Sequence, residues 1–146
     1  MQEIEIEHLR PLKLFHFAIF PVPFNDKILK SLVKSPFSRV LVAKNGIIGC
    51  LCSAIKKIDG NDTLYIYSLG VHPCNREKGV GSSFMNYLEE EARKHGLSEI
   101  VLHVQIGNET AVKFYEKRGF VTRKEINNYY MGLDEGNALE MVKHIN

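Results

Sequence analysis

A glycine-rich turn between a strand-like run and a helix-like run constrains this chain more than any other segment. Residues 64–71 have the aromatic, β-branched character of a strand, and residues 80–95 have helical spacing. Between them lie Arg76 and Gly79, with Gly81 just inside the helix-like run. A strand that enters a helix through such a turn presents backbone N–H groups to an anion at the helix N-terminus. The sequence therefore predicts a site for a phosphate-bearing ligand, and the alternative is an ordinary glycine-rich turn.

Two common phosphate-binding loops do not match this turn. A P-loop requires a glycine followed by Lys and then Ser or Thr, whereas two serines follow Gly81. A dinucleotide-binding fingerprint requires a third glycine, and Phe84 stands at that position. The spacing that remains, Arg76-x-x-Gly79-x-Gly81, resembles the acetyl-CoA signature of the GNAT acetyltransferases.

Composition indicates an ordinary globular chain, and its 146 residues fit one domain, 1–146, with one core. The 19 basic and 17 acidic residues are too balanced for a protein that binds nucleic acid by charge alone. Apolar runs fall short of the ~20 residues of a membrane helix, and residues 1–7 do not resemble a signal peptide. We therefore expect a cytoplasmic protein without a nucleic-acid or membrane partner.

The three cysteines, Cys50, Cys52 and Cys74, are expected to be free thiols because no secretory signal accompanies them. Cys50 and Cys52 lie two apart in a strand-like run, so they share one face and are expected to pack as small apolar groups. Without a second cysteine pair this spacing does not predict zinc, and no metal is expected. Cys74 lies in the glycine-rich turn, but no nearby residue forms an activating pair that would make it a nucleophile.

Apolar periodicity and turn residues predict alternating strands and helices. The expected strands cover residues 3–7, 39–43, 47–58, 64–71, 100–105, 120–126 and 138–142. The expected helices begin near Leu9, after Asn25, at Val80 and after Asn108. About seven strands and four helices in this order indicate an α/β fold on a mixed, partly parallel sheet. The same order is found in the GNAT fold.

Two strand residues are candidates for proton transfer. Side chains alternate across a strand, so Tyr65 shares a face with Tyr67 and Leu69, and His103 lies on one face of residues 100–105. If these strands are neighbours, Tyr65 and His103 flank the same cleft. Each has an alternative role in the core, Tyr65 as a packed aromatic and His103 as a hydrogen-bonded histidine.

Longer segments extend the resemblance to NatE-type N-alpha-acetyltransferases of the GNAT superfamily. The similar segments are residues 20–27, 64–70, 102–111, 114–120 and 127–130. The resemblance implies the GNAT acyltransferase fold and direct transfer of acetyl from acetyl-CoA to the α-amine of Met-initiated proteins in a ternary complex. It also implies that nascent N-termini are the acceptors and that NatA complex subunits at the ribosome are partners.

The resemblance assigns roles to individual residues. Tyr65 and His103 would be catalytic and would hold a water molecule that accepts the amine proton. The residues implied at acetyl-CoA are Leu69, Gly70, Val71, Arg76, Glu77, Lys78, Gly79, Val80, Gly81, Ser82, Asn108, Phe114, Tyr115 and Lys117. The residues implied at the peptide are Phe20, Pro21, Val22, Phe24, Tyr67, Tyr129 and Tyr130.

Some details depart from the family pattern or stay open. Phe24 stands where tyrosine is usual, and Tyr67 stands where methionine is common, so fine specificity is open. Tyr115 is either a proton donor to the departing thiolate or a helix-face aromatic, and Gly70 suits a bulge beside the thioester. The alternatives for function are a lysine acetyltransferase and a mainly non-catalytic subunit docked on the NatA complex.

Overall fold

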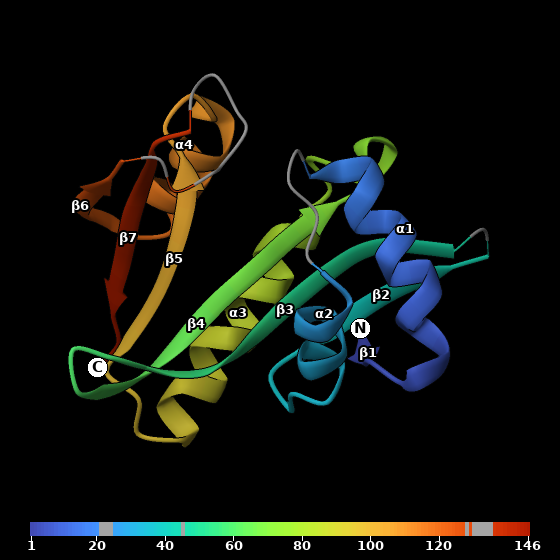
Figure 1. Cartoon of the computed structure of the whole chain (residues 1–146), viewed down its shortest axis with the longest axis horizontal. Helices are drawn as coiled ribbons and strands as arrows, with labels where there is room; N and C mark the ends of the chain where they lie inside the picture. Colours follow the sequence, from blue (N-terminus) through green and yellow to red (C-terminus); the bar gives the residue numbers. More distant parts are fainter. Residues whose placement is uncertain (21–24, 45, 128, 130–135) are drawn as a thin grey trace. The chain divides into compact units, whose positions relative to one another are not determined.

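The computed structural model describes residues 1–20, 25–44, 46–127, 129 and 136–146 (Figure 1). Its helices are α1 (Leu9–Ile19), α2 (Asp26–Val33), α3 (Val80–Lys94) and α4 (Glu109–Lys117), with two short 3-10 helices, η1 (Ile6–His8) and η2 (Pro73–Asn75). Its strands are β1 (Gln2–Glu3), β2 (Arg39–Ala43), β3 (Gly46–Ile58), β4 (Asn61–Val71), β5 (Glu99–Gln105), β6 (Val121–Ile126) and β7 (Ala138–His144). Within these ranges, every helix is too short or too polar to cross a membrane.

The described strands form a mixed sheet with the hydrogen-bonding order β1-β2-β3-β4-β5-β7-β6. Strands β4 and β5 run parallel, and α3 lies between them in the chain. Parallel neighbours need a long crossover connection, which α3 supplies. The expected α/β class, the mixed sheet and the order of the main elements are confirmed.

Local sequence signals account for most element ends. The side chains of Asn25 and Asn108 accept hydrogen bonds from the backbone N–H groups three residues on, and so cap α2 and α4. Gly96 and Gly119 follow α3 and α4 with positive φ, as helix-ending glycines do. The strand expected over residues 3–7 is shorter, because the chain turns into η1, where the Glu5 N–H donates to the His8 side chain.

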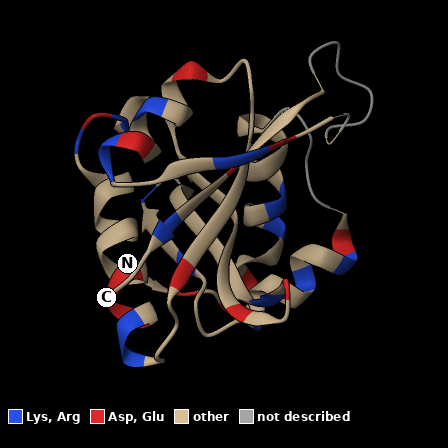
Figure 2. Cartoon of the chain, turned by 90° about the vertical axis from the view of Figure 1, so that its left-hand side faces the viewer, with Lys and Arg blue, Asp and Glu red and all other residues tan. Residues whose placement is uncertain are grey.

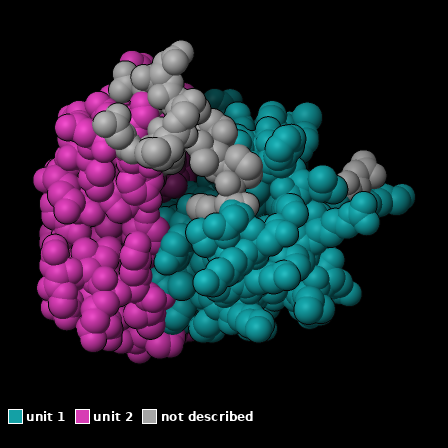
Figure 3. Space-filling model, viewed as in Figure 1, with its two compact units in different colours: residues 1–54, 66–91 teal, residues 55–65, 92–146 magenta. Residues whose placement is uncertain are grey.

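The described residues divide into two compact units, coloured separately in Figure 3. Unit 1 comprises residues 1–54 and 66–91, and unit 2 comprises residues 55–65 and 92–146. Basic and acidic residues are interspersed along the elements visible in Figure 2, in keeping with the nearly balanced composition. The two units are described one at a time below.

In unit 1, helices cover both sides of β3. Cys50 and Cys52 point toward α1 and α2, where they join a core cluster that includes Leu12 and Leu29. The alternate position, Gly49, faces α3: a Cβ atom there would lie 3.0 Å from the ring of Phe84. Alternation along β3 therefore sends small residues to both faces and lets helices approach closely.

Gly70 of β4 is a second point of close approach in unit 1. A Cβ atom at this position would lie 2.8 Å from the ring of Phe20 and 3.2 Å from that of Phe15. Contacts under 3.0 Å essentially do not occur at real Cβ atoms. Glycine is required here by the aromatic rings at the end of α1, and the bulge expected at Gly70 stays a prediction.

In unit 2, β7 pairs antiparallel with β5 on one side and with β6 on the other. The Tyr115 ring of α4 packs edge-on against Phe114 and Phe120, at centroid distances of 5.2 and 5.4 Å. Tyr115 is buried. Its position supports the interpretation as a packed aromatic of α4, and its expected role toward a thiolate stays a prediction.

We predict that Gly70→Ala destabilises the chain by about 1–3 kcal/mol, the usual cost of adding a methyl group to a packed site. The measurement is urea unfolding followed by circular dichroism. Adding Phe20→Leu should recover part of the loss, because the smaller side chain vacates the contact. Equal stability of Gly70→Ala and the unaltered protein would contradict the packing described here.

Candidate active site

Unit 2 brings Tyr65 and His103 into direct contact. The Tyr65 hydroxyl on β4 lies 2.5 Å from Nδ1 of His103 on β5. Both side chains are largely buried, with 9% of the His103 side chain exposed. The expectation that these residues share one site is therefore met by a hydrogen bond, whereas the water molecule expected to accept the amine proton stays a prediction.

Glu140 determines which nitrogen of His103 carries the proton. Its Oε1 lies 3.1 Å from His103 Nε2, and the two residues are direct partners in the β5–β7 register. An ionised carboxylate only accepts hydrogen bonds, so Nε2 is the protonated nitrogen of the neutral ring. Nδ1 then carries the lone pair and accepts the hydrogen bond that the Tyr65 hydroxyl donates.

Arg123 holds the other oxygen of the same carboxylate. Its Nε donates to Glu140 Oε2 at 2.9 Å, and its Nη1 donates to Glu99 at 3.0 Å. Arg123 occupies the register shift of β6, between Thr122 and Lys124, and such a shift redirects a side chain. The shift thus aims a guanidinium at a carboxylate on the adjacent strand.

The pKa values of this group favour a neutral histidine beside an ionised carboxylate. Burial lowers the pKa of His103, and Lys56 and Lys124 lower it further, against an opposing effect of Glu140. Burial alone would raise the pKa of Glu140, but the hydrogen bond and charge of Arg123 bring it below its ordinary value. His103 is therefore available as a proton acceptor at neutral pH.

Tyr129 and Lys56 complete the surroundings of the pair. The Tyr129 ring stacks on His103 at a centroid distance of 4.7 Å, and its hydroxyl lies 3.3 Å from that of Tyr65. The Lys56 ammonium lies 4.5 Å above the Tyr65 ring. Tyr129 was expected at the peptide, and the structure places its ring directly against His103 and its hydroxyl beside that of Tyr65.

In unit 1, the glycine-rich turn ends at the N-terminus of α3. The first intrahelical bond of α3 runs from Ser83 N–H to the Gly79 carbonyl, so the N–H groups of the three residues between them precede the helical hydrogen-bond ladder. Gly79 has a φ of 81°, and residues 76–79 are exposed. Arg76 donates from Nε to the Val71 carbonyl, which ties the turn to the end of β4. This geometry suits an anionic group, as the sequence predicts.

Most of the other residues expected at acetyl-CoA or at the peptide can be located in the structure, but their contacts with these ligands stay predictions. Leu69, Gly70 and Val71 form the end of β4, and Glu77, Lys78, Val80, Gly81 and Ser82 belong to the turn and the first turn of α3. Asn108, Phe114, Tyr115 and Lys117 cap or belong to α4. Phe20 follows α1, and Tyr67 packs against the unit 1 core cluster. Pro21, Val22, Phe24 and Tyr130, all expected at the peptide, lie outside the described residues.

Comparisons with known proteins place this arrangement in a family. Residues 8–120 match the model of the acetyltransferase (GNAT) family. The chain belongs to the GNAT acetyltransferase family. It is 31% identical to N-alpha-acetyltransferase 50 of Danio rerio over 98% of this chain and 86% of that protein. It is 30% identical to the probable N-acetyltransferase san of Drosophila melanogaster over 93% of this chain and 75% of that protein.

A solved structure gives the same family placement. Arabidopsis thaliana Naa50, in complex with the bisubstrate analogue CoA-Ac-MVNAL, superposes with a TM-score of 0.88 at 30% identity. The match covers 97% of this chain and 95% of that one. These comparisons confirm the GNAT fold that the sequence predicts. They also confirm the inferred resemblance to N-alpha-acetyltransferases.

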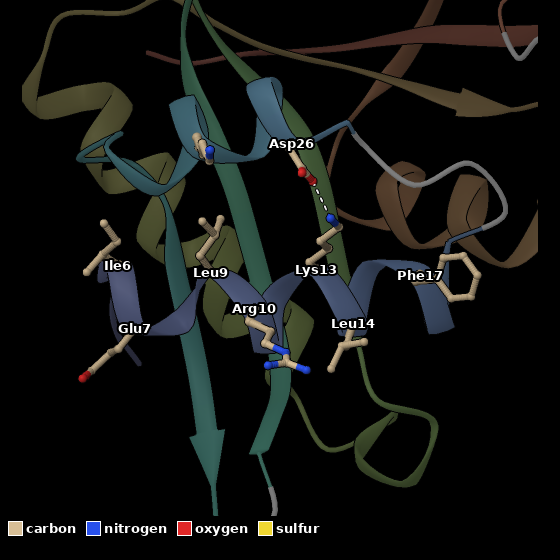
Figure 4. Close-up of a pocket in the computed structure, with 9 residues that line it drawn as sticks. Ile6, Glu7, Leu9, Arg10, Lys13, Leu14, Phe17 and Asp26 are labelled. Atoms are coloured by element: carbon tan, nitrogen blue, oxygen red, sulfur yellow. Dashed lines mark ion pairs between the residues drawn. The ribbon is translucent and has the colours of Figure 1, made fainter.

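This GNAT protein also has a groove on unit 1 with a volume of ≈ 740 Å³, along α1 and the start of α2 (Figure 4). Leu14 and Phe17 line it and are 63% and 75% exposed. Lys13 and Asp26 form a 2.7 Å ion pair across it. The described residues that line the groove do not include those expected at acetyl-CoA or at the peptide.

Glu140 and Arg123 were not foreseen from the sequence. A signal for Glu140 was present, because its carboxylate interrupts an otherwise apolar run, Ala138-Leu139-Glu140-Met141-Val142. A carboxylate in a buried strand needs a partner. The partner itself depends on the β5–β7 register, which local sequence does not specify.

We predict that Glu140→Gln lowers the pKa of His103 further below its ordinary value. The amide retains a hydrogen-bond acceptor but loses the negative charge that favours the imidazolium form. Histidine ring signals followed by NMR across a pH titration would measure the change. The control is Glu125→Gln on the exposed side of β6, which should leave the pKa in place. An unchanged value in Glu140→Gln would contradict the coupling.

Proposed function

We propose that this protein acetylates the α-amine of Met-initiated polypeptides, with acetyl-CoA as the donor. The observation that carries the proposal is the continuous hydrogen-bonded chain from Tyr65 through His103 to Glu140, in a member of the GNAT family. The Danio rerio relative, at 31% identity, is an N-alpha-acetyltransferase, and the Drosophila melanogaster relative, at 30%, is the probable N-acetyltransferase san. The solved relative binds the bisubstrate analogue CoA-Ac-MVNAL, whose peptide begins with M.

The proton chemistry of an α-amine matches this hydrogen-bonded chain. A free α-amine has a pKa of about 7.7–8.0, so an appreciable fraction is neutral and nucleophilic at pH 7. As the amine nitrogen forms a bond to the acetyl carbon and the thioester C–S bond breaks, one proton must leave that nitrogen. The water molecule held by Tyr65 and His103 accepts it and gives a proton to Tyr65, which passes its own hydroxyl proton to Nδ1 of His103. The tyrosine hydroxyl therefore never has to carry a negative charge. This matters because an ordinary tyrosine, with a pKa of about 10, is neutral at pH 7.

Glu140 supports this transfer from the far side of the imidazole. Once Nδ1 has taken a proton, His103 is a cation, and the Glu140 carboxylate lies 3.1 Å from Nε2. An opposite charge at this distance favours the charged form of the ring. The carboxylate thus lowers the cost of protonating a buried histidine without acting as the base itself.

Acetyl-CoA supplies the activated acetyl group and an anionic pyrophosphate. The N–H groups at the start of α3, together with Arg76 and Lys78, are the groups of this chain that would bind the pyrophosphate. Their exposure and the positive φ of Gly79 support that assignment. A phosphate can therefore reach the backbone closely at this turn.

A lysine side chain is the second candidate acceptor. Its amine has a pKa of about 10.4, so far less of it is neutral at pH 7. A histidine with a lowered pKa is a weak base for removing the extra proton. The relay is therefore better matched to an α-amine.

The proposal extends to the setting of the reaction. With nascent N-termini as acceptors, the protein would act in the cytoplasm. Its resemblance to NatE-type enzymes supports docking on NatA complex subunits at the ribosome. Solved relatives of the same fold include the NatB and NatC complexes, which supports assembly with a partner subunit.

We predict that Tyr65→Phe lowers kcat by about 10²- to 10⁴-fold, the usual contribution of a positioned acid–base group. Acetyl-CoA affinity should change little. In the unaltered protein, protonation of the α-amine should lower the rate below about pH 8. Protonation of His103 should add a second fall below about pH 6.5, because its pKa lies under the ordinary histidine value. Steady-state kinetics from pH 5 to 9 would measure both effects.

The matched control is Tyr87→Phe, which removes a hydroxyl on α3 that donates to the Pro36 carbonyl. Its turnover should equal that of the unaltered protein. Equal turnover in Tyr65→Phe would remove the hydroxyl from the proton route while leaving the acetyltransferase assignment intact.

We predict that purified protein with acetyl-CoA modifies the α-amine of a Met-Leu peptide faster than the ε-amine of an N-terminally blocked lysine peptide. Mass spectrometry of the products would give both rates. Faster lysine modification would reverse the choice between the two acceptors. Absence of any product, with acetyl-CoA binding intact, would contradict catalysis.

A further inference from the structure

Unit 1 gathers three metal-ligating side chains in its core. The ligand atoms of His16, Cys50 and Cys52 all lie within 4.8 Å of one another. His16 is 1% exposed and both cysteines are fully buried. The cysteines share one face of β3, and α1 brings the histidine to that face. Burying a histidine is costly unless its ring nitrogens have partners.

The hydrogen bonds of His16 orient it as metal-binding histidines are oriented. Its Nδ1 lies 2.9 Å from the Leu12 carbonyl, which can only accept, so Nδ1 carries the proton of the neutral ring. The lone pair on Nε2 therefore points away from α1, and Ser68 Oγ lies 2.8 Å from it. A ligating histidine almost always donates its other N–H to a carbonyl or carboxylate, as here.

We propose that Cys50, Cys52 and His16 bind one Zn²⁺ ion in the core of unit 1. Two thiolates and one imidazole nitrogen form a ligand set that Zn²⁺ prefers, and two thiolate charges cancel those of the ion. A neutral cluster avoids most of the cost of burying charge.

The spacing of the three atoms needs little adjustment. Around tetrahedral Zn²⁺, ligand atoms lie about 3.6–3.8 Å apart, given Zn–S and Zn–N bonds near 2.3 and 2.05 Å. The present separations, at most 4.8 Å, close to these values through side-chain shifts of about 1 Å or less. Ser68 Oγ, on β4, donates a hydrogen bond of 2.8 Å to Nε2. The metal bond would replace this hydrogen bond and leave the hydroxyl beside the fourth position.

The site would join helix and sheet within unit 1. The histidine comes from the last turns of α1, the cysteines from β3 and the serine from β4. The His16 ring also packs on Phe20, at a centroid distance of 5.1 Å, where the chain leaves α1. A bound ion would therefore fix the end of α1 and raise stability by mass action. The sequence alone disfavours zinc because the third ligand belongs to a distant helix.

The test uses the full chain, freed of metal with a chelator and titrated with Co²⁺ under reducing conditions. One equivalent should produce thiolate-to-cobalt charge transfer and the visible bands of tetrahedral Co²⁺, and Zn²⁺ should abolish both. Zn²⁺ should also raise the Tm, which binding to the unfolded chain would not do. A folded protein without the thiolate band or the rise in Tm overturns the proposal.

Variants separate this site from the exposed thiol. Cys74→Ala should retain the full Co²⁺ spectrum, because Cys74 is exposed in the glycine-rich turn and outside the cluster. Cys52→Ala and His16→Gln, confirmed as folded by circular dichroism, should lose it. A spectrum that disappears in Cys74→Ala overturns the assignment. If the core variants do not fold, the unaltered protein and Cys74→Ala still decide the question. None of these readouts involves acetyl transfer, so failure here leaves the proposed function standing.

Discussion

The polar groups of unit 2 are arranged around one buried negative charge. Only 5% of the Glu140 side chain is exposed, and an unpaired carboxylate at such a position would cost several kcal/mol. Because β7 lies between β5 and β6, one carboxylate is held by His103 on one side and by Arg123 on the other. Pairing that charge also selects the His103 tautomer that accepts a hydrogen bond from Tyr65. The same contacts pair the buried charge and provide the geometry of the proposed proton relay.

Unit 1 depends instead on close approach between backbone and side chains. Gly49 lets α3 settle against β3, and Gly70 accommodates the aromatic rings at the end of α1. The same packing presses His16 of α1 toward the small thiol side chains of β3. A larger residue at Cys50 or Cys52 would fill the space in which the proposed ion would lie. Small residues thus serve both the helix packing and the inferred metal site.

Much of the fold follows from local signals, and parts of the site do not. The asparagine caps of α2 and α4 and the turn before α3 all appear where short-range chemistry predicts them. Alternation along strands correctly paired Tyr65 with His103, but the direct hydrogen bond depends on how closely the two strands bring the side chains. The role of Glu140 could not be predicted, because its partner His103 lies 37 residues away in the chain. The β5–β7 register that brings them together is not encoded by any local pattern.

The sequence by itself determined the order of elements, the GNAT resemblance and the position of the glycine-rich turn. Those features arise from backbone preferences and side-chain periodicity within a few residues, so they can be predicted from the sequence alone. Only the tertiary structure decided that Glu140 pairs with both His103 and Arg123. It alone also brings His16 close to Cys50 and Cys52. Both clusters join side chains from elements far apart in the chain. Their contacts depend on strand register and helix packing, which form only when the whole fold is assembled.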